Sequence, residues 1–213
     1  MTLHHAYFTI TFKRKQDKQK GIQMIKLIAS DVDGTLVKDG TLMINPEYMT
    51  VIHKLVEKGI IFVVCSGRQF ASERRLFAPI VNELYYISDG GTVVRTPDKI
   101  LKTYPMSDEL CTPEFIPYWK KHAQVAAAGK EWVDCNAAGA NKWTAISYLM
   151  EYFGLNADEV CVFGDNLNDI EMLTNAGTSY AVSNARPEVI QAAKYTCAPY
   201  WESGVLHILK EFL

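Results

Sequence analysis

Two short stretches of the sequence concentrate carboxylates at close spacing. Asp31 and Asp33 lie in the run Asp-Val-Asp-Gly-Thr, and Asp165 and Asp169 are the first and last residues of Asp-Asn-Leu-Asn-Asp. Carboxylates brought to one point repel each other unless a cation joins them, and an all-oxygen ligand set suits Mg²⁺. An EF-hand calcium loop is excluded, because leucine stands where that loop, counted from Asp31, needs its glycine and its glutamate. The two stretches therefore predict a magnesium site.

A hydroxyl and an amine accompany these carboxylates. Ser66 opens the run Ser-Gly-Arg after an apolar stretch, and Lys142 follows Asn141 in the first turn of a predicted helix. Ser66 taken alone could simply cap a helix. A cation at Lys142 faces the positive end of the helix dipole, which costs a little energy and suggests a functional use. Together the two side chains can bind the phosphoryl oxygens that a magnesium ion leaves free.

The chemistry that these residue types support is phosphoryl transfer. A carboxylate held beside phosphorus can attack it in line and form an aspartyl-phosphate. A second carboxylic acid two residues on can protonate the leaving oxygen and then act as the base for the hydrolytic water. The sequence thus predicts catalysis by positioning and charge neutralisation.

Such a site needs a fold that brings distant parts of the chain to one edge. Apolar strands alternate with amphipathic helices from residue 24 onward, which predicts an α/β fold: a three-layer, Rossmann-like, doubly wound parallel sheet. The expected strands are 25–30, 60–65, 84–87, 160–163 and 178–182. One helix is expected to begin after Asn45. Further helices are expected at 69–82, 141–153, 167–175, 187–194 and 203–212. Ligands of such sheets bind beyond the carboxyl ends of the strands, where the motif residues fall.

The alternation of strands and helices breaks between residues 91 and 136. A hairpin is expected over 92–104, with one or two short strands in 124–135. The predicted organisation is a catalytic core of residues 24–90 and 137–213, a small α+β cap inserted at 91–136, and an N-terminal extension at 1–23 outside the fold. The extension carries a basic run at 13–20, which is interpreted as a solvated tail, with a nucleic-acid or membrane tether as the alternative.

Composition narrows the classes of function. Of 213 residues, 22 are basic and 24 acidic, for a formal charge of −2, which argues against a dedicated nucleic-acid binder. No apolar run approaches the ~20 residues of a membrane-spanning helix. Five cysteines without a Cys-x-x-Cys pair favour a reducing compartment. We expect a cytoplasmic enzyme acting on a small phosphorylated metabolite, with no nucleic-acid or membrane partner, and homodimer formation stays open.

As a set, the motifs resemble those of the haloacid dehalogenase-like superfamily, in particular its Cof-type sugar-phosphatase branch, from about Met24 to Leu213. DVDGTLV (31–37) is similar to the nucleophile motif, SGR (66–68) to the phosphate-binding motif, GANK (139–142) to the lysine motif and GDNLND (164–169) to the magnesium motif. The resemblance implies a Mg²⁺-dependent phosphatase that hydrolyses small phosphate monoesters, such as sugar phosphates, through an aspartyl-phosphate.

The resemblance also implies a role for each motif residue. Asp31 would be the nucleophile and Asp33 the general acid/base. Mg²⁺ would be held by the carboxylates of Asp31 and Asp165 and the backbone carbonyl of Asp33, with Asp169 supporting it from the outer shell or through water. The phosphoryl group would be contacted by Ser66, the Gly67 amide, Lys142 and Asn168. Residues 36–44 would form a hairpin flap.

Two features depart from that branch. The segment 91–136 is shorter than the cap that the branch usually carries, and Trp143 follows the lysine where a small residue is common. Three alternatives remain. A phosphomutase or phosphotransferase is disfavoured by the short stretch between Asp31 and Ser66, and a receiver-like signalling module lacks these motifs. The third is a catalytically weak protein that binds phosphorylated metabolites.

Overall fold

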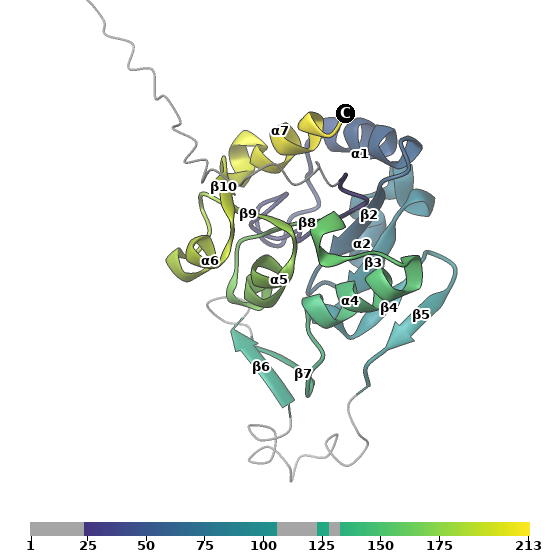
Figure 1. Ribbon diagram of the computed structural model, residues 1–213, viewed down its shortest axis with the longest axis vertical. Helices are drawn as coiled ribbons and strands as arrows, with labels where there is room; N and C mark the ends of the chain where they lie inside the picture. Colours follow the sequence, from purple (N-terminus) through teal and green to yellow (C-terminus); the bar gives the residue numbers. More distant parts are fainter. Residues whose placement is uncertain (1–23, 106–122, 128–132) are drawn as a thin grey trace, which may run out of the picture.

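A twisted eight-stranded sheet forms the centre of the molecule in the computed structural model, which describes residues 24–105, 123–127 and 133–213 (Figure 1). The strand order is β10-β9-β8-β1-β2-β3-β4-β5, and the first six of these run parallel. These six are β1 (Leu27–Ser30), β2 (Ile61–Cys65), β3 (Tyr85–Ser88), β8 (Val160–Gly164), β9 (Thr178–Val182) and β10 (Tyr195–Cys197). The predicted α/β fold with a mostly parallel sheet is confirmed.

Helices cover both faces of the sheet. On one face α1 (Glu47–Glu57) packs against α7 (Gly204–Glu211). On the other, α5 (Ile170–Asn175) lies between α4 (Lys142–Phe153) and α6 (Pro187–Ala192), and contacts both (Figure 1). The central strands β1 and β8 are buried from end to end. Burial on both faces explains why these strands are continuous apolar runs without alternation.

Most differences from the predicted elements lie at their ends. The helix expected at 69–82 divides into α2 (Phe70–Leu76) and a 3₁₀ helix, η1 (Ala78–Glu83), and Pro79 at the junction cannot donate a backbone hydrogen bond. The helix expected at 167–175 likewise begins as a 3₁₀ turn, η6 (Leu167–Asp169). The flap expected at 36–44 is not a hairpin. It consists of turns and chain without regular secondary structure, with one isolated bridge between Asp33 and Val37.

The hairpin expected at 92–104 is present as β4 (Val93–Arg95) and β5 (Ile100–Thr103), but it continues the main sheet. β4 pairs antiparallel with β3, and β5 forms the sheet edge. A separate two-stranded sheet is made by β6 (Ala123–Ala127) and β7 (Val133–Ala137), and β6 contacts η6 of the core. The division into a core and an inserted cap stays a prediction. The extension at 1–23 lies outside the described residues.

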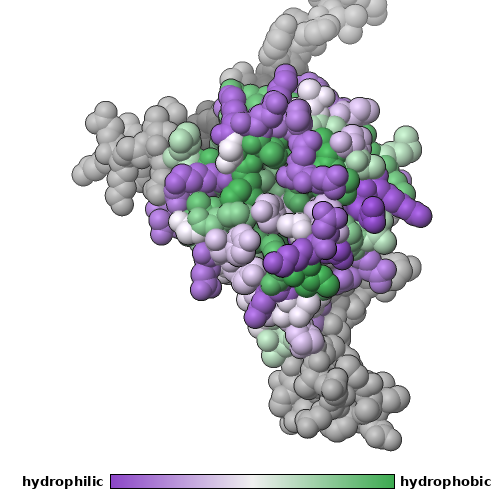
Figure 2. Space-filling view, turned by 90° about the vertical axis from the view of Figure 1, so that its right-hand side faces the viewer, coloured by the Kyte–Doolittle hydropathy of each residue, from purple (hydrophilic) through white to green (hydrophobic). Residues whose placement is uncertain are grey.

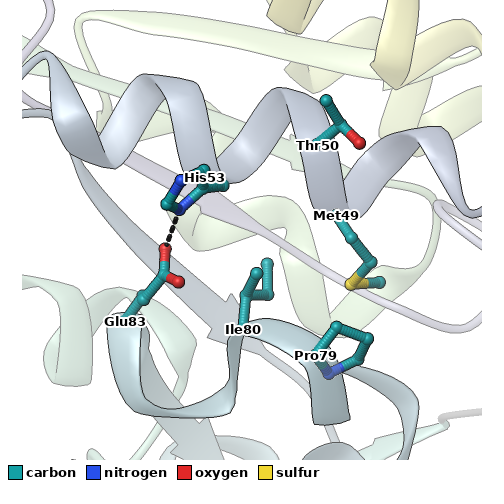
Figure 3. Close-up of a pocket in the computed structure, with 6 residues that line it drawn as sticks. All are labelled: Met49, Thr50, His53, Pro79, Ile80 and Glu83. Carbon is teal, nitrogen blue, oxygen red and sulfur yellow. Dashed lines mark hydrogen bonds and ion pairs between the residues drawn. The ribbon is translucent and has the colours of Figure 1, made fainter.

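On the face shown in Figure 2, hydrophobic residues lie in small patches between hydrophilic ones. A pocket of about 300 Å³ lies between α1 and η1, where His53 pairs with Glu83 at 2.7 Å (Figure 3). Its η1 wall directly precedes β3, at the opposite end of that strand from the motif residues. Among the described residues, no helix has the length and hydropathy needed to span a membrane.

Candidate active site

Three of the predicted motifs follow three neighbouring strands. Asp31 follows β1, Ser66 follows β2 and Asp165 follows β8, and both β2 and β8 pair with β1. In the pairing register, Ser30 lies opposite Val64 on one side and Phe163 on the other. The three strands therefore end at nearly the same level, and their carboxyl ends deliver the motif residues to one edge of the sheet.

The first turn of α4 brings Lys142 to this edge. The side chain of Asn141 caps the helix by accepting a hydrogen bond from the Thr144 N–H at 2.9 Å. Gly91, which follows β3 with φ +107°, lets the chain pass close to the helix start, since a Cβ there would lie 2.4 Å from the Asn141 carbonyl. The turn that follows β3 is thus in direct contact with the start of α4.

Lys142 joins two of the carboxylates. Its side chain is 1% exposed, and Nζ lies 2.6 Å from Asp31 Oδ1 and 2.7 Å from Asp169 Oδ1. Burial alone would lower the pKa of Lys142, but the charges of Asp169 and Asp31 raise it well above its ordinary value. Lys142 therefore places a positive charge between two acidic groups.

Three carboxylates form a compact cluster beside this lysine. One oxygen from each of Asp31, Asp165 and Asp169 lies within 4.8 Å of the others. Burial raises the pKa of Asp31 to about 7 and that of Asp165 to about 9, against the lowering effect of Lys142. For Asp165 the neighbouring charges of Asp31 and Asp169 add to the rise. One lysine does not neutralise this concentration of acids, so the site favours a further cation.

The donors in this cluster fit a divalent metal ion. Asp31 Oδ2 is buried and has no hydrogen-bond partner among the described residues, so this oxygen could bind a metal ion. Asp165 stands against Gly34, where a Cβ would lie 2.1 Å from Asp165 Oδ2. Asp169 differs, because its Oδ2 accepts the N–H groups of Asp165 and Asn166 at 2.9 and 3.0 Å. With both oxygens engaged, Asp169 suits the predicted supporting role.

Asp33 lies apart from the cluster, although it is two residues from Asp31. Its side chain is 30% exposed and pairs with Arg68, with Nε 2.6 Å from Oδ2 and Nη2 2.7 Å from Oδ1. The Gly40 N–H donates to Oδ1 as well, at 2.8 Å. The carboxyl group of Asp33 therefore faces the loop after the nucleophile motif, while the Asp31 carboxyl faces the lysine.

The remaining predicted phosphate ligands lie on two loops. Ser66 is buried, its Oγ accepts the Arg68 N–H at 3.1 Å, and its backbone N–H donates to Ile87 O at 2.9 Å. Gly67 is exposed at the tip of the same loop. Asn168 lies in η6, and its Oδ1 is buried without a partner among the described residues. The contacts of these three residues with phosphate stay predictions.

Comparison with known proteins decides the family. The sequence profile of the haloacid dehalogenase-like hydrolases matches residues 28–123 and 109–209. The chain belongs to this family. A solved structure from Eubacterium rectale has 54% sequence identity and a TM-score of 0.82, and the match covers 89% of this chain and 100% of that one.

Two curated relatives of this hydrolase are similar over nearly their whole length. The 5-amino-6-(5-phospho-D-ribitylamino)uracil phosphatase YbjI of Escherichia coli is 26% identical, over 89% of this chain and 96% of its own. The enzyme of the same description from Bacillus subtilis, YcsE, is 25% identical with the same two coverages. The family and these relatives make the chain a phosphoric monoester hydrolase.

Sequence reasoning missed two residues that shape the site of this hydrolase. Arg68 stood in the second motif, but nothing in its spacing indicated that it pairs with Asp33. Asn184 follows β9, and its Nδ2 donates to Gly34 O at 2.8 Å while its Oδ1 accepts the Tyr200 N–H at 3.0 Å. The rule that led to the other site residues, polar side chains directly after strands, would have found Asn184 too.

Proposed function

We propose that this hydrolase is a Mg²⁺-dependent phosphatase that cleaves small phosphate monoesters through an aspartyl-phosphate on Asp31. The observation that carries the proposal is the environment of the Asp31 carboxyl group. One of its oxygens is held by the buried Lys142, and the other is unpaired beside two further carboxylates. A nucleophile for phosphorus needs a fixed orientation and an oxygen that no hydrogen bond occupies.

The first half of the proposed reaction transfers the phosphoryl group to the protein. The Asp31 carboxylate attacks phosphorus in line, and the bond between phosphorus and the ester oxygen breaks. Asp33 gives its proton to that oxygen, which leaves as an alcohol. Lys142 and the hydroxyl of Ser66 hold phosphoryl oxygens, and a bound Mg²⁺ would neutralise charge on the phosphoryl group and the acidic cluster.

The second half releases phosphate. Asp33, now ionised, takes a proton from a water molecule that attacks the phosphorus, and the bond to Asp31 breaks. Inorganic phosphate leaves, and both carboxyl groups return to their starting states. The chain's own residues thus supply the nucleophile, the acid, the base and the phosphate contacts, and Asp31, Asp165 and the Asp33 carbonyl would hold the metal.

The proposed substrates are small phosphorylated metabolites, sugar phosphates and related compounds. Relatives described as 5-amino-6-(5-phospho-D-ribitylamino)uracil phosphatases support this choice, because their substrate is a phosphate ester of a polyol chain. We also propose a cytoplasmic location, because five cysteines without a Cys-x-x-Cys pair favour a reducing compartment. No nucleic-acid or membrane partner is proposed, and a homodimer is to be tested by the mass of the protein in solution.

The experiment is phosphate release from a panel of esters by wild type, Asp31→Asn and Asp98→Asn. Asp98 is exposed in the turn between β4 and β5 and serves as the matched control. Wild type and Asp98→Asn are expected to release phosphate with Mg²⁺ and to stop in EDTA. Asp31→Asn is expected to be inactive and folded, because an amide cannot form the aspartyl-phosphate. Turnover by purified Asp31→Asn at a near-normal rate would contradict the mechanism.

A further inference from the structure

The side chain of Arg68 makes hydrogen bonds to three different residues. Its guanidinium donates to both oxygens of Asp33, from Nε to Oδ2 at 2.6 Å and from Nη2 to Oδ1 at 2.7 Å. Nη2 also donates to Thr41 O at 2.8 Å, and Nη1 lies 3.4 Å from Ser72 Oγ. The side chain is 10% exposed, so these contacts are made largely away from solvent.

We propose that Arg68 is the positioning residue for proton transfer: it fixes the carboxyl group of Asp33 so that the proton reaches the leaving oxygen. The proposal rests on the proposed function, in which Asp33 is the general acid/base. A guanidinium bound to both carboxylate oxygens fixes the plane and the direction of that carboxyl, which a single hydrogen bond cannot do. Proton transfer is sensitive to this, because the acid must stand within hydrogen-bond reach of the leaving oxygen.

The backbone of Arg68 is itself held from two sides. Its N–H donates to Ser66 Oγ at 3.1 Å, and its carbonyl accepts the Asp89 N–H at 3.0 Å. The residue therefore joins the phosphate-binding loop after β2 to the segment after β3. A side chain that starts from so fixed a backbone can place the carboxyl group it binds with little freedom.

Arg68 also ties Asp33 to the loop that follows the nucleophile motif. The Gly40 N–H donates to Asp33 Oδ1, and the neighbouring Thr41 carbonyl accepts from the guanidinium. Asp33, the loop at 40–41 and Arg68 thus form one closed set of hydrogen bonds. Nε and Nη2 are committed to this set, which leaves only Nη1, 3.4 Å from Ser72 Oγ, for any contact with a phosphoryl group.

The test compares two esters whose need for a general acid differs. An alkyl ester such as ribose 5-phosphate expels an alkoxide and needs a proton at once, whereas 4-nitrophenyl phosphate expels a stable anion and needs little help. The quantity to measure is kcat/KM, because it includes only the steps up to release of the alcohol and leaves out the hydrolysis of the aspartyl-phosphate.

Arg68→Ala is expected to lower kcat/KM for the alkyl ester by roughly 100-fold and for the aryl ester by less than about 5-fold, because general acid catalysis contributes about that much. Arg68→Lys keeps the charge but cannot bind both oxygens in the same way, so it should recover only part of the loss. It also gives the same comparison if Arg68→Ala does not fold. Arg75→Ala, an exposed change in α2, the helix that follows Arg68, is the control and should change neither value.

A double mutant separates this role from direct substrate binding. If Arg68 acts only through Asp33, then Arg68→Ala should change kcat/KM by less than about 2-fold when it is added to Asp33→Asn. An equal loss for both esters in Arg68→Ala, or a full further loss in the Asp33→Asn background, would overturn the proposal. Absence of Mg²⁺-dependent hydrolysis of both esters by wild type would instead overturn the proposed function and this inference with it.

Discussion

Replacing Lys142 with methionine is expected to destabilise the protein strongly. The change keeps most of the volume of the side chain and removes the charge that lies between Asp31 and Asp169. These two carboxylates are 5% and 0% exposed, so water cannot take over the role of the lysine. Removing one partner from a buried ion pair costs about 3–5 kcal/mol, because the other charge is left uncompensated.

For a chain of this size, 1 kcal/mol shifts the melting temperature by about 2–4 °C, which gives a loss of roughly 6–20 °C for Lys142→Met. The loss should shrink as the pH is lowered, because burial raises the pKa of Asp31 and its protonated carboxyl needs no cation. Added Mg²⁺ should recover part of the stability, since it binds the folded state. Thermal unfolding followed by circular dichroism at pH 5 and pH 8, with and without Mg²⁺, measures all three effects.

The matched control is Lys210→Met. Lys210 pairs with Glu47 at 2.6 Å, a distance equal to that between Lys142 and Asp31, but both side chains are about half exposed. An exposed pair contributes about 0–1 kcal/mol, so this variant should unfold within a few degrees of wild type. If Lys142→Met in EDTA at pH 8 unfolds as close to wild type as the control does, the buried charge balance described here is wrong.

Three further outcomes are expected. Gly34→Ala should raise the Mg²⁺ concentration needed for half-maximal activity by tenfold or more, because the new Cβ meets Asp165 Oδ2 at a residue with φ +78°; an unchanged requirement would contradict the placement of Asp165. Burial raises the pKa of Glu73 well above 4.5, so the folded state keeps a proton that the unfolded chain loses, and stability falls as the pH rises above about 4.5. Glu73→Gln should therefore raise the melting temperature more at pH 8 than at pH 5, and an equal change at both would show that Glu73 is ionised. Because the segment 91–136 is short and can cover little of a leaving group, the preference among small esters should stay below about a thousandfold in kcat/KM, roughly 4 kcal/mol; a larger preference in a monomer would refute that argument.

The positions of the central parallel strands could be predicted from the sequence, because strands buried on both faces consist of consecutive apolar residues. Val160 to Phe163 is apolar throughout, and all four residues are fully buried. β10 was missed for the opposite reason. It has only three residues, it lies at the sheet edge, and Tyr195 and Thr196 are exposed, so that only Cys197 is buried. An edge strand this short has too little buried surface to leave a pattern.

The sequence predicted which segments form most of the strands and which residues are acidic. It did not predict which strands pair or which side chains contact each other. The hairpin of β4 and β5 was expected, but its sequence does not say whether it pairs with β3 or with an inserted cap. Likewise, Asp31 and Asp33 share one motif, and their different neighbours depend on residues far along the chain, Lys142 and Arg68. Local patterns predict strands, turns and acidic residues, while these contacts are set only when the whole sheet has formed.

The two carboxyl groups of the first motif acquire different chemistry from those neighbours. Asp31 is buried, and burial raises its pKa to about 7, so its surroundings work against the ionised form despite the charge of Lys142. A protonated carboxyl is a poor nucleophile, and a cation shared with Asp165 would favour the ionised form. The expected requirement for Mg²⁺ then has two physical sources, the charge of the phosphoryl group and the ionisation of the nucleophile itself. Asp33 lies outside that cluster, with its side chain 30% exposed and both of its oxygens bound by Arg68, so the proposed acid and the proposed nucleophile have separate surroundings.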